Sequence, residues 1–360
     1  MCPDILPLER SDQFCRDNNL GVPILLSPMA GACPPALSIA VSKAGGMGAC
    51  GVLLMQPEAI EQWMQEFRSA TSGPVMLNSW IPDPEPTSDP LHEAAVRSFL
   101  EQFGPKIPDG IERKQPPDFE GQCEAMLNNR PDVISSIMGL FNPSFVKRMK
   151  EAGIRWYATV TTVGEAIEAT EAGADVVVAQ GMEAGGHRGA FDAENASERM
   201  VGLTSLVPAV VDAVDVPVVA AGGIADGRGI AAALALGASA VQIGTGFLRC
   251  PEAGIPAAWA DAIGTARPED TIGTRAFSGR YGRSLRTSYA ELASQPDSPD
   301  PAPYPIQRAL TQPMRDDANR TGDIDRMQAW AGQSAGLAQA TTPAGLIAET
   351  WSEAQRVLRR

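Results

Sequence analysis

The chain has 360 residues, a formal net charge of −14, 44% hydrophobic residues and 20% charged residues. This composition predicts a packed globular core, and the lack of a basic surface argues against a nucleic-acid partner. No apolar run approaches the roughly 18 residues of a membrane span, and the first ten residues lack the features of a secretory signal. We therefore expect a cytoplasmic protein with no membrane partner.

Eight short β-rich runs alternate with helix-like segments along the first 250 residues. We predict strands at 23–27, 46–50, 74–78, 133–137, 155–159, 175–179, 216–221 and 240–243, and helices that start near residues 35, 57, 120, 143, 163, 204 and 226. Near-continuous apolar runs are typical of parallel strands covered by helices. Eight such units predict a TIM (β/α)8 barrel, a fold that commonly takes about 250 residues.

Two regions interrupt this alternation. Residues from about 79 to 118 are rich in proline and charge and follow the third strand, so we predict a rim insertion there. From residue 251 helix-like segments are broken by the proline-dense stretch 295–305, which favours an extended crossing segment. The predicted organisation is a barrel over 1–250 and a helical lid or substrate domain over 251–360.

Several chemistries are disfavoured by what the chain lacks. The six cysteines form no C-x-x-C pair and there are only two histidines, so we expect no metal site and no disulfide framework. All five lysines precede the predicted fifth strand and none ends a strand, which disfavours a Schiff-base mechanism.

Glycine-rich loops follow the seventh and eighth predicted strands, at 221–228 and 242–247. Glycines let backbone N–H groups approach a dianion, and TIM barrels commonly bind phosphate in these two loops. We expect phosphate contacts from Gly222, Gly223, Gly244 and Thr245. The alternative is a pair of tight turns with no ligand.

His187 follows the very apolar sixth strand in the segment Gln180-Gly-Met-Glu-Ala-Gly-Gly-His187. Paired glycines, Gly185 and Gly186, would let the backbone pass beside a flat ring and direct the imidazole inward. With a reference pKa near 6.5, such a histidine can serve as a base, an acid or a hydrogen-bond donor. The alternative is a structural histidine. For Glu183 we expect a loop carboxylate that orders backbone amides.

Further candidates end the first and third strands. Pro28, Met29 and Ala30 form a turn whose amide and soft side chain would suit an isoalloxazine ring. Asn78 offers a donor and an acceptor to a pyrimidine edge or a ribityl hydroxyl. Packing at the barrel rim is the alternative for both.

Taken together, these segments resemble the nitronate monooxygenases, formerly 2-nitropropane dioxygenases, and in particular their class I branch. The resemblance rests on 28–31, 44–48, 180–189, 217–229 and 242–247, and on the tail segments 274–280 and 328–333. It implies a TIM barrel that binds flavin mononucleotide (FMN), with His187 as the active-site histidine. It implies FMN contacts from Met29, Asn78, Gln180, Gly223, Gly244 and Thr245.

The resemblance also marks two places where this chain differs. Thr159 would face the flavin where some relatives have a lysine. Class I relatives often carry an S-F-x-F-G-like stretch where this chain has Ser-Ser-Ile-Met-Gly at 135–139, so Ile137 and Met138 would line the substrate pocket instead of aromatic groups. Tyr304 in the tail is the tyrosine we expect to reach the active site, with a packing role as the alternative.

The resemblance implies oxidation of alkyl nitronates, such as propionate 3-nitronate, by O2 to a carbonyl compound and nitrite. His187 would hydrogen-bond the anionic nitro group or take the α-proton of a neutral nitroalkane. An FMN-dependent NAD(P)H reductase, acting on enoyl-acyl-carrier protein or quinone, is one alternative. A non-redox barrel that binds a phosphorylated metabolite is another. The expected partners are the small nitronate and O2, and we leave a homodimer open.

Overall fold

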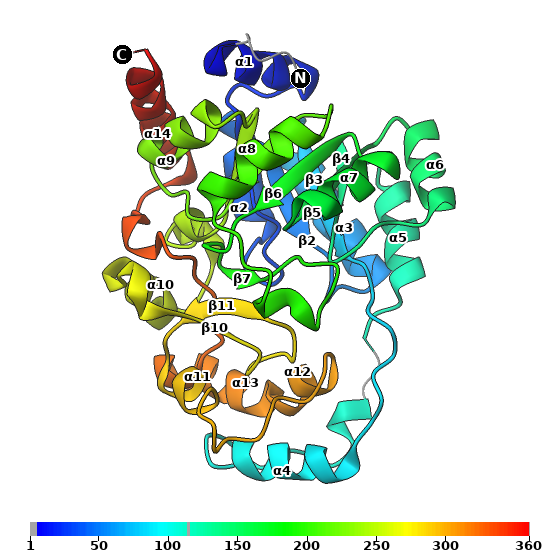
Figure 1. Ribbon diagram of the computed structural model, residues 1–360, viewed down its shortest axis with the longest axis vertical. Coiled ribbons are helices and arrows are strands. Elements are labelled where there is room, and N and C mark those ends of the chain that lie inside the picture. The colour runs from blue at the N-terminus through cyan, green and yellow to red at the C-terminus, as the bar shows by residue number, and fades with distance from the viewer. Residues whose placement is uncertain (1–5, 114–115, 360) are drawn as a thin grey trace.

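A computed structural model describes residues 6–113 and 116–359. Eight parallel strands form one sheet in the order β1-β9-β8-β6-β5-β4-β3-β2 (Figure 1). A parallel bridge between Leu25 and Met47 brings the two edges of this sheet together, so the sheet closes into the predicted TIM barrel. The strands are β1 (Ile24–Leu26), β2 (Gly48–Gly51), β3 (Val75–Trp80), β4 (Val133–Ile137), β5 (Arg155–Val160), β6 (Val176–Gln180), β8 (Val218–Ala221) and β9 (Ala240–Ile243).

Seven helices lie outside the strands, and each begins within one residue of its predicted start. They are α2 (Pro35–Lys43), α3 (Pro57–Ala70), α5 (Phe119–Asn128), α6 (Pro143–Glu151), α7 (Val163–Glu171), α8 (Leu203–Ala213) and α9 (Gly227–Ala235). Side-chain caps mark several of these starts, as where the Asn142 oxygen accepts from the amide of Phe145 at 2.8 Å. All strand residues except Trp80, Ile137 and Arg155 are buried because the helices cover them, which explains why the strand sequences are mainly apolar.

A second, smaller sheet lies across the carboxyl ends of the barrel strands (Figure 1). It contains β7 (Gly186–His187), β11 (Gly282–Leu285) and β10 (Thr271–Thr274), all antiparallel. The sequence predicted only helices in the tail. A two-residue strand that pairs with a segment about 95 residues away leaves no local period, so this sheet could not be read from hydrophobic patterning.

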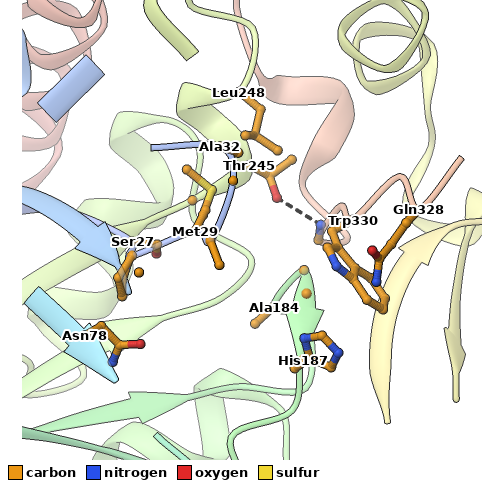
Figure 2. A pocket seen from close by; sticks show the side chains of 18 of the residues that line it. Ser27, Met29, Ala32, Asn78, Ala184, His187, Thr245, Leu248, Gln328 and Trp330 are labelled. Carbon is orange, nitrogen blue, oxygen red and sulfur yellow. Dashed lines mark hydrogen bonds between the residues drawn. The ribbon is translucent and has the colours of Figure 1, made fainter. Parts of the chain in front are cut away.

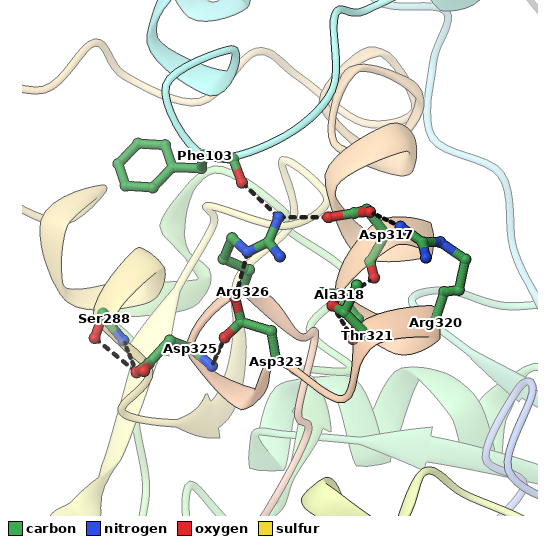
Figure 3. Close-up of polar contacts among 9 residues, drawn as sticks. All are labelled: Phe103, Ser288, Asp317, Ala318, Arg320, Thr321, Asp323, Asp325 and Arg326. Carbon is green, nitrogen blue, oxygen red and sulfur yellow. Dashed lines mark hydrogen bonds and ion pairs between the residues drawn. The ribbon is translucent and has the colours of Figure 1, made fainter.

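The rim insertion and the tail share one hydrophobic cluster. Helix α4 (Pro90–Leu100) contributes Val96 and Leu100, which pack with residues of α11 (Ser288–Leu292), α12 (Ile306–Leu310) and α13 (Gln312–Thr321). Polar contacts reinforce the junction: the Arg326 guanidinium donates to the Phe103 carbonyl at 2.9 Å and to Asp317 at 2.8 Å (Figure 3). The insertion therefore folds as part of the tail layer.

Two terminal helices pack across the division predicted at residue 250. Helix α14 (Pro343–Leu358) returns to the barrel and packs on α9 and α2, and α1 (Pro7–Asp17) contacts α9 and α14. Helix α10 (Ala257–Thr265) begins the tail. The tail layer thus comprises the insertion and residues 257–337. Helix α14 does not belong to it, because this helix packs on the outside of the barrel. Within the described chain, no helix is both long and apolar enough to span a membrane.

Candidate active site

A cavity of about 400 Å³ lies at the carboxyl ends of the barrel strands, beneath the tail layer. Figure 2 shows side chains from strand ends, such as Asn78, facing tail side chains, such as Trp330, across this space. The predicted site residues that line it come from seven separate strand-end segments. They are Pro28, Met29, Ala30, Asn78, Ile137, Thr159, Gln180, Gly185, Gly186, His187, Gly222, Gly223, Gly244 and Thr245.

Two predicted pocket residues, Met138 and Tyr304, are not among the residues that line the cavity. Met138 follows the last residue of β4, has a φ of 69° and is 3% exposed, so the chain turns there and buries this side chain away from Ile137. Tyr304 instead packs on Trp80, with ring centroids 5.4 Å apart, and Trp80 itself lines the cavity. Tyr304 therefore contacts the cavity wall indirectly, through the indole of Trp80.

The loop after β8 has a backbone geometry that favours its two glycines. Gly222 and Gly223 have φ angles of 106° and 67°, which L side chains rarely adopt. A Cβ on Gly222 would lie 3.0 Å from the Cβ and the amide nitrogen of Ala184. Glycine therefore lets this loop pack closely on the loop that carries Ala184 while both glycines line the cavity.

Buried polar side chains hold the His187 loop in place. Gln180 donates to the His187 carbonyl at 3.0 Å and accepts from the Gly189 amide at 2.8 Å. The carboxylate of Glu183 accepts from the Leu203 amide, at 2.9 and 3.1 Å, at the start of α8. Glu183 thus orders the backbone amide of Leu203, in line with the role expected of it as a loop carboxylate, and both polar ends of Gln180 are used by the loop itself.

The paired glycines Gly185 and Gly186 allow the tail to pack closely on the loop that carries His187. A Cβ on Gly185 would lie 2.4 Å from the backbone nitrogen of Gly332, and Gly332 in turn donates to the Thr245 hydroxyl at 3.0 Å (Figure 2). Gly186 has a φ of 75°. The glycines let the tail segment 331–332 close directly onto the loop that carries His187.

Three tail or strand-end residues surround the His187 ring. Its Nε2 lies 2.7 Å from the Ser278 hydroxyl oxygen. The indoles of Trp80 and Trp330 meet it edge-on, with ring centroids 4.6 and 4.8 Å away. The sequence reasoning missed these neighbours as site residues. Ser278 and Trp330 nevertheless lie within the tail segments 274–280 and 328–333, which carried part of the family resemblance.

The environment of His187 lowers its pKa to about 3. Burial is the largest cause, followed by the positive charges of Arg280, Arg308 and Arg315. The imidazole is therefore neutral across the physiological range. A neutral imidazole with this pKa is a weak base but still donates one hydrogen bond through its ring N–H. Hydrogen bonding to a ligand is therefore favoured over proton abstraction as the role of His187.

We expect this shift to appear in acid stability. A histidine whose folded pKa is below its unfolded value stabilises the fold fully above pH 6.5, and that contribution is lost as pH falls toward 3, because the unfolded chain binds the proton first. His187→Gln removes the titration. The melting temperature of the native protein minus that of His187→Gln should therefore decrease between pH 7 and pH 4.5. A difference that stays constant across this range would contradict the lowered pKa.

Buried polar atoms without a protein partner lie in the cavity wall. They are the Gln242 side-chain oxygen, the Trp259 indole N–H and the Gln328 side-chain nitrogen. Buried polar groups are rarely left unpaired in native proteins, so each indicates a contact with a ligand or solvent. Gln242 is the third residue of β9 and lies close to the second glycine loop. None of the three was selected from the sequence, although Gln242 and Gln328 open two of the recognised motifs.

The charged groups of the wall come from the tail alone. Among the described residues that line the cavity, the only charged side chains are Arg308 and Arg315. No described group of three His, Cys, Asp or Glu side chains is placed to hold a metal ion. The site therefore offers neutral hydrogen-bond donors, bare glycine backbone and positive charge.

Comparisons with known sequences agree with this arrangement. The family model described as Nitronate monooxygenase matches residues 16–352. A nitronate monooxygenase of Paraburkholderia phytofirmans is 36% identical over 344 residues, which covers 94% of this chain and 93% of the relative. A probable nitronate monooxygenase of Staphylococcus aureus is 37% identical over 330 residues, covering 90% and 92%.

Solved structures show the same similarity. A nitroalkane oxidase from Streptomyces ansochromogenes superposes with a TM-score of 0.83 at 34% identity, covering 94% of this chain and 98% of that one. FabK from Thermotoga maritima superposes with a TM-score of 0.74 at 28% identity, covering 96% and 97%. The family match over almost the whole chain, together with the histidine and glycine loops around one cavity, shows that the chain is an oxidoreductase that belongs to the nitronate monooxygenase family.

Proposed function

We propose that this protein binds FMN and oxidises alkyl nitronates, such as propionate 3-nitronate, with O2 to a carbonyl compound and nitrite. Family membership and the nitroalkane oxidase likeness support oxidation of nitro compounds in general. The observation that carries the finer proposal is the neutral His187, which faces the cavity between Trp80 and Trp330.

The residues present fit FMN. The glycine loops after β8 and β9 would bind its phosphate through backbone N–H groups. The Cβ that any other residue would place at Gly244 would lie 3.3 Å from Ser27 and 3.4 Å from the Met29 sulfur, so glycine keeps this part of the wall open. Asn78 donates to the Ser135 hydroxyl at 2.9 Å, which leaves its oxygen for a ligand donor, and the unpaired Gln242 oxygen faces the same cavity from β9.

When bound, FMN would supply the electron transfer between the substrate and O2. The protein's own part is to hold and orient the reactants. Because Nε2 of His187 is engaged by Ser278, the tautomer with the proton on Nδ1 leaves a ring N–H for a nitro oxygen. The edge-on indoles exclude water from this hydrogen bond. A pKa of about 3 makes His187 a poor base for the α-proton, which favours a preformed nitronate over a neutral nitroalkane as substrate.

The competing function is an FMN-dependent NAD(P)H reductase, which the structural similarity to FabK supports. The two functions differ in the electron donor. Anaerobic mixing with propionate 3-nitronate should bleach the flavin absorbance within one turnover, whereas anaerobic NADH should leave it unchanged. The reverse result would replace the proposal with the reductase.

The direct test is oxygen consumption by the purified protein. We expect a yellow protein that consumes O2 and releases nitrite with propionate 3-nitronate, and that does not oxidise NADH at a comparable rate. If the protein shows no flavin absorbance after reconstitution with FMN, the proposed function is wrong, and a non-redox barrel that binds a phosphorylated metabolite becomes the favoured hypothesis.

A further inference from the structure

One arginine of the tail, Arg280, reaches two other segments that surround the active site. Its side chain is 4% exposed, and it lies two residues before Gly282 of β11, which pairs with His187 in the tail sheet. Its Nη2 donates to the Ala190 carbonyl at 3.2 Å, and its Nη1 lies 3.4 Å from a carboxylate oxygen of Asp83. Arg280 therefore connects the tail to the loop that follows β7 and to the segment that leads from β3 into the rim insertion.

Each of the three segments that meet at Arg280 also carries one member of the histidine site, within three residues of the contact. These members are Trp80 in the segment after β3, His187 in the loop, and Ser278 in the tail. Trp80 and Ser278 contact the imidazole ring directly. A guanidinium that joins the three segments therefore fixes where these two neighbours lie relative to the ring.

The turn that carries Ser278 also includes Arg280. The Arg280 amide donates to the Ser278 hydroxyl at 3.3 Å, and the same hydroxyl oxygen lies 3.3 Å from the Arg280 carbonyl oxygen. Gly279 between them has a φ of 87°, and a Cβ there would lie 2.4 Å from the Ala302 carbonyl oxygen. The turn is therefore tight, and the place of the Ser278 hydroxyl depends on the place of Arg280.

Asp83 supplies the counter-charge of Arg280. Among the described residues, it provides the one Asp or Glu oxygen within 4.0 Å of this guanidinium, and Nη1 is buried and makes no hydrogen bond to any of them. Burial lowers the pKa of Arg280 and raises the pKa of Asp83, and each charge opposes the effect of burial on the other. A buried cation without a counter-ion is costly, so loss of the Asp83 charge should displace the guanidinium.

A second arginine joins the insertion to the tail away from the cavity. Arg326 donates to the Phe103 carbonyl at 2.9 Å and to Asp317 at 2.8 Å (Figure 3). None of these three residues is among the described residues that line the cavity. The two arginines therefore make the same kind of junction between the same layers, but only Arg280 makes it beside His187. Comparing them separates a contribution to stability from a contribution to the active site.

We propose that Arg280 and Asp83 are positioning residues of the active site. The pair holds Trp80 and Ser278 against the ring of His187 and thereby keeps the ring N–H directed at the substrate. Neither Arg280 nor Asp83 is among the described residues that line the cavity, so the pair acts through these neighbours and not by contact with the substrate. The expected loss of turnover rests on the proposed function, whereas the expected loss of order at His187 does not.

The kinetic test compares Asp83→Asn, which removes the carboxylate charge at nearly constant size, with Arg326→Gln at the other junction. We expect Asp83→Asn to lower kcat/KM for propionate 3-nitronate by about tenfold to a hundredfold, the upper end being the effect of a misplacement near 1 Å. Arg326→Gln should lower the melting temperature at least as much but leave kcat/KM within about twofold of the native value, since distant sites act independently. Losses of kcat/KM that follow the melting temperature equally in both variants would make the pair purely structural and overturn the proposal.

Substitutions of the arginine test whether the two residues act as a pair. Arg280→Lys keeps a positive charge beside Asp83 but has one head group in place of the two nitrogens that Arg280 uses, so it should keep more turnover than Arg280→Met. In the Arg280→Met protein, Asp83→Asn should cause little further loss, because both changes remove the same contact. Two full losses that multiply in the double variant would overturn the pairing.

Imidazole resonances separate this inference from the proposed function, because the chain has only two histidines, His92 and His187. In purified protein labelled with 15N-histidine, comparison with His92→Asn identifies the ring signals of His187. We expect Asp83→Asn to shift and broaden these signals, whereas Arg326→Gln should leave them unchanged. If the protein oxidises no nitronate, the proposed function fails, and these spectra still test the positioning role. Native His187 signals in Asp83→Asn would overturn it.

Discussion

Replacing His187 with Asn will leave FMN bound and will lower kcat/KM for propionate 3-nitronate by about a hundredfold to a thousandfold, the loss typical of removing one donor to a developing or resident oxyanion. Asn is too short to reach the Ser278 hydroxyl that lies 2.7 Å from Nε2, so its amide has no fixed orientation. FMN should stay because the phosphate loops and Asn78 belong to other strand ends. Steady-state oxygen consumption and the flavin content of the purified variant measure the two effects.

A graded comparison tests the donor role more closely. An Asn amide can still place an N–H near the position of Nδ1, whereas His187→Ala removes every donor, so the alanine variant should be slower than the asparagine variant. His92→Asn changes the chain's other histidine, in α4 of the insertion, and should not alter kcat/KM. Unchanged turnover in His187→Asn would remove His187 from the mechanism, and loss of FMN in that variant would reassign it to cofactor binding.

Replacing Gly185 with Ala will separate the tail from the barrel mouth. The added Cβ would lie 2.4 Å from the Gly332 nitrogen and 2.5 Å from the Ala331 carbonyl carbon, and since both are backbone atoms, no side-chain rotation relieves the clash. Overpacking of this kind typically costs about 1–3 kcal/mol. Because Gly185 lies two residues before His187 and Gly332 two residues after Trp330, we also expect kcat/KM to fall by about a hundredfold, the effect of a misplacement near 1 Å.

Thermal unfolding of the holoenzyme and steady-state kinetics measure the two consequences. The matched control is Gly164→Ala in α7, where a Cβ would meet only the Thr162 hydroxyl oxygen at 4.0 Å. That variant should keep both the melting temperature and kcat/KM. A Gly185→Ala enzyme with native values of both would show that the contact between the loop and segment 331–332 does not hold the site together.

The barrel was predictable because its signals are local. Each strand is short and mainly apolar, and every barrel helix except α8 begins at a proline or at a capping side chain such as Asn142, so both periods can be read within a few residues. The strand-end candidates followed from the barrel, since the carboxyl ends of all its strands meet on one face. The residues of the substrate wall were harder to predict from the sequence. Ile137 lines the cavity as predicted, but the turn at Met138 depends on the local backbone angles, and the position of Tyr304 depends on its packing against Trp80.

The sequence by itself determined the barrel, the two glycine loops, and His187 as the candidate active-site residue, because each depends on residue types within one strand and its following loop. Only the tertiary structure decided how His187 behaves. Its pKa near 3, its contact with Ser278 and the two indoles around it come from segments 90 or more residues apart, brought together by a tail sheet that has no sequence period. The positive charge of the cavity wall arises in the same way, because Arg308 and Arg315 belong to tail helices and line the cavity only where the tail closes over the barrel.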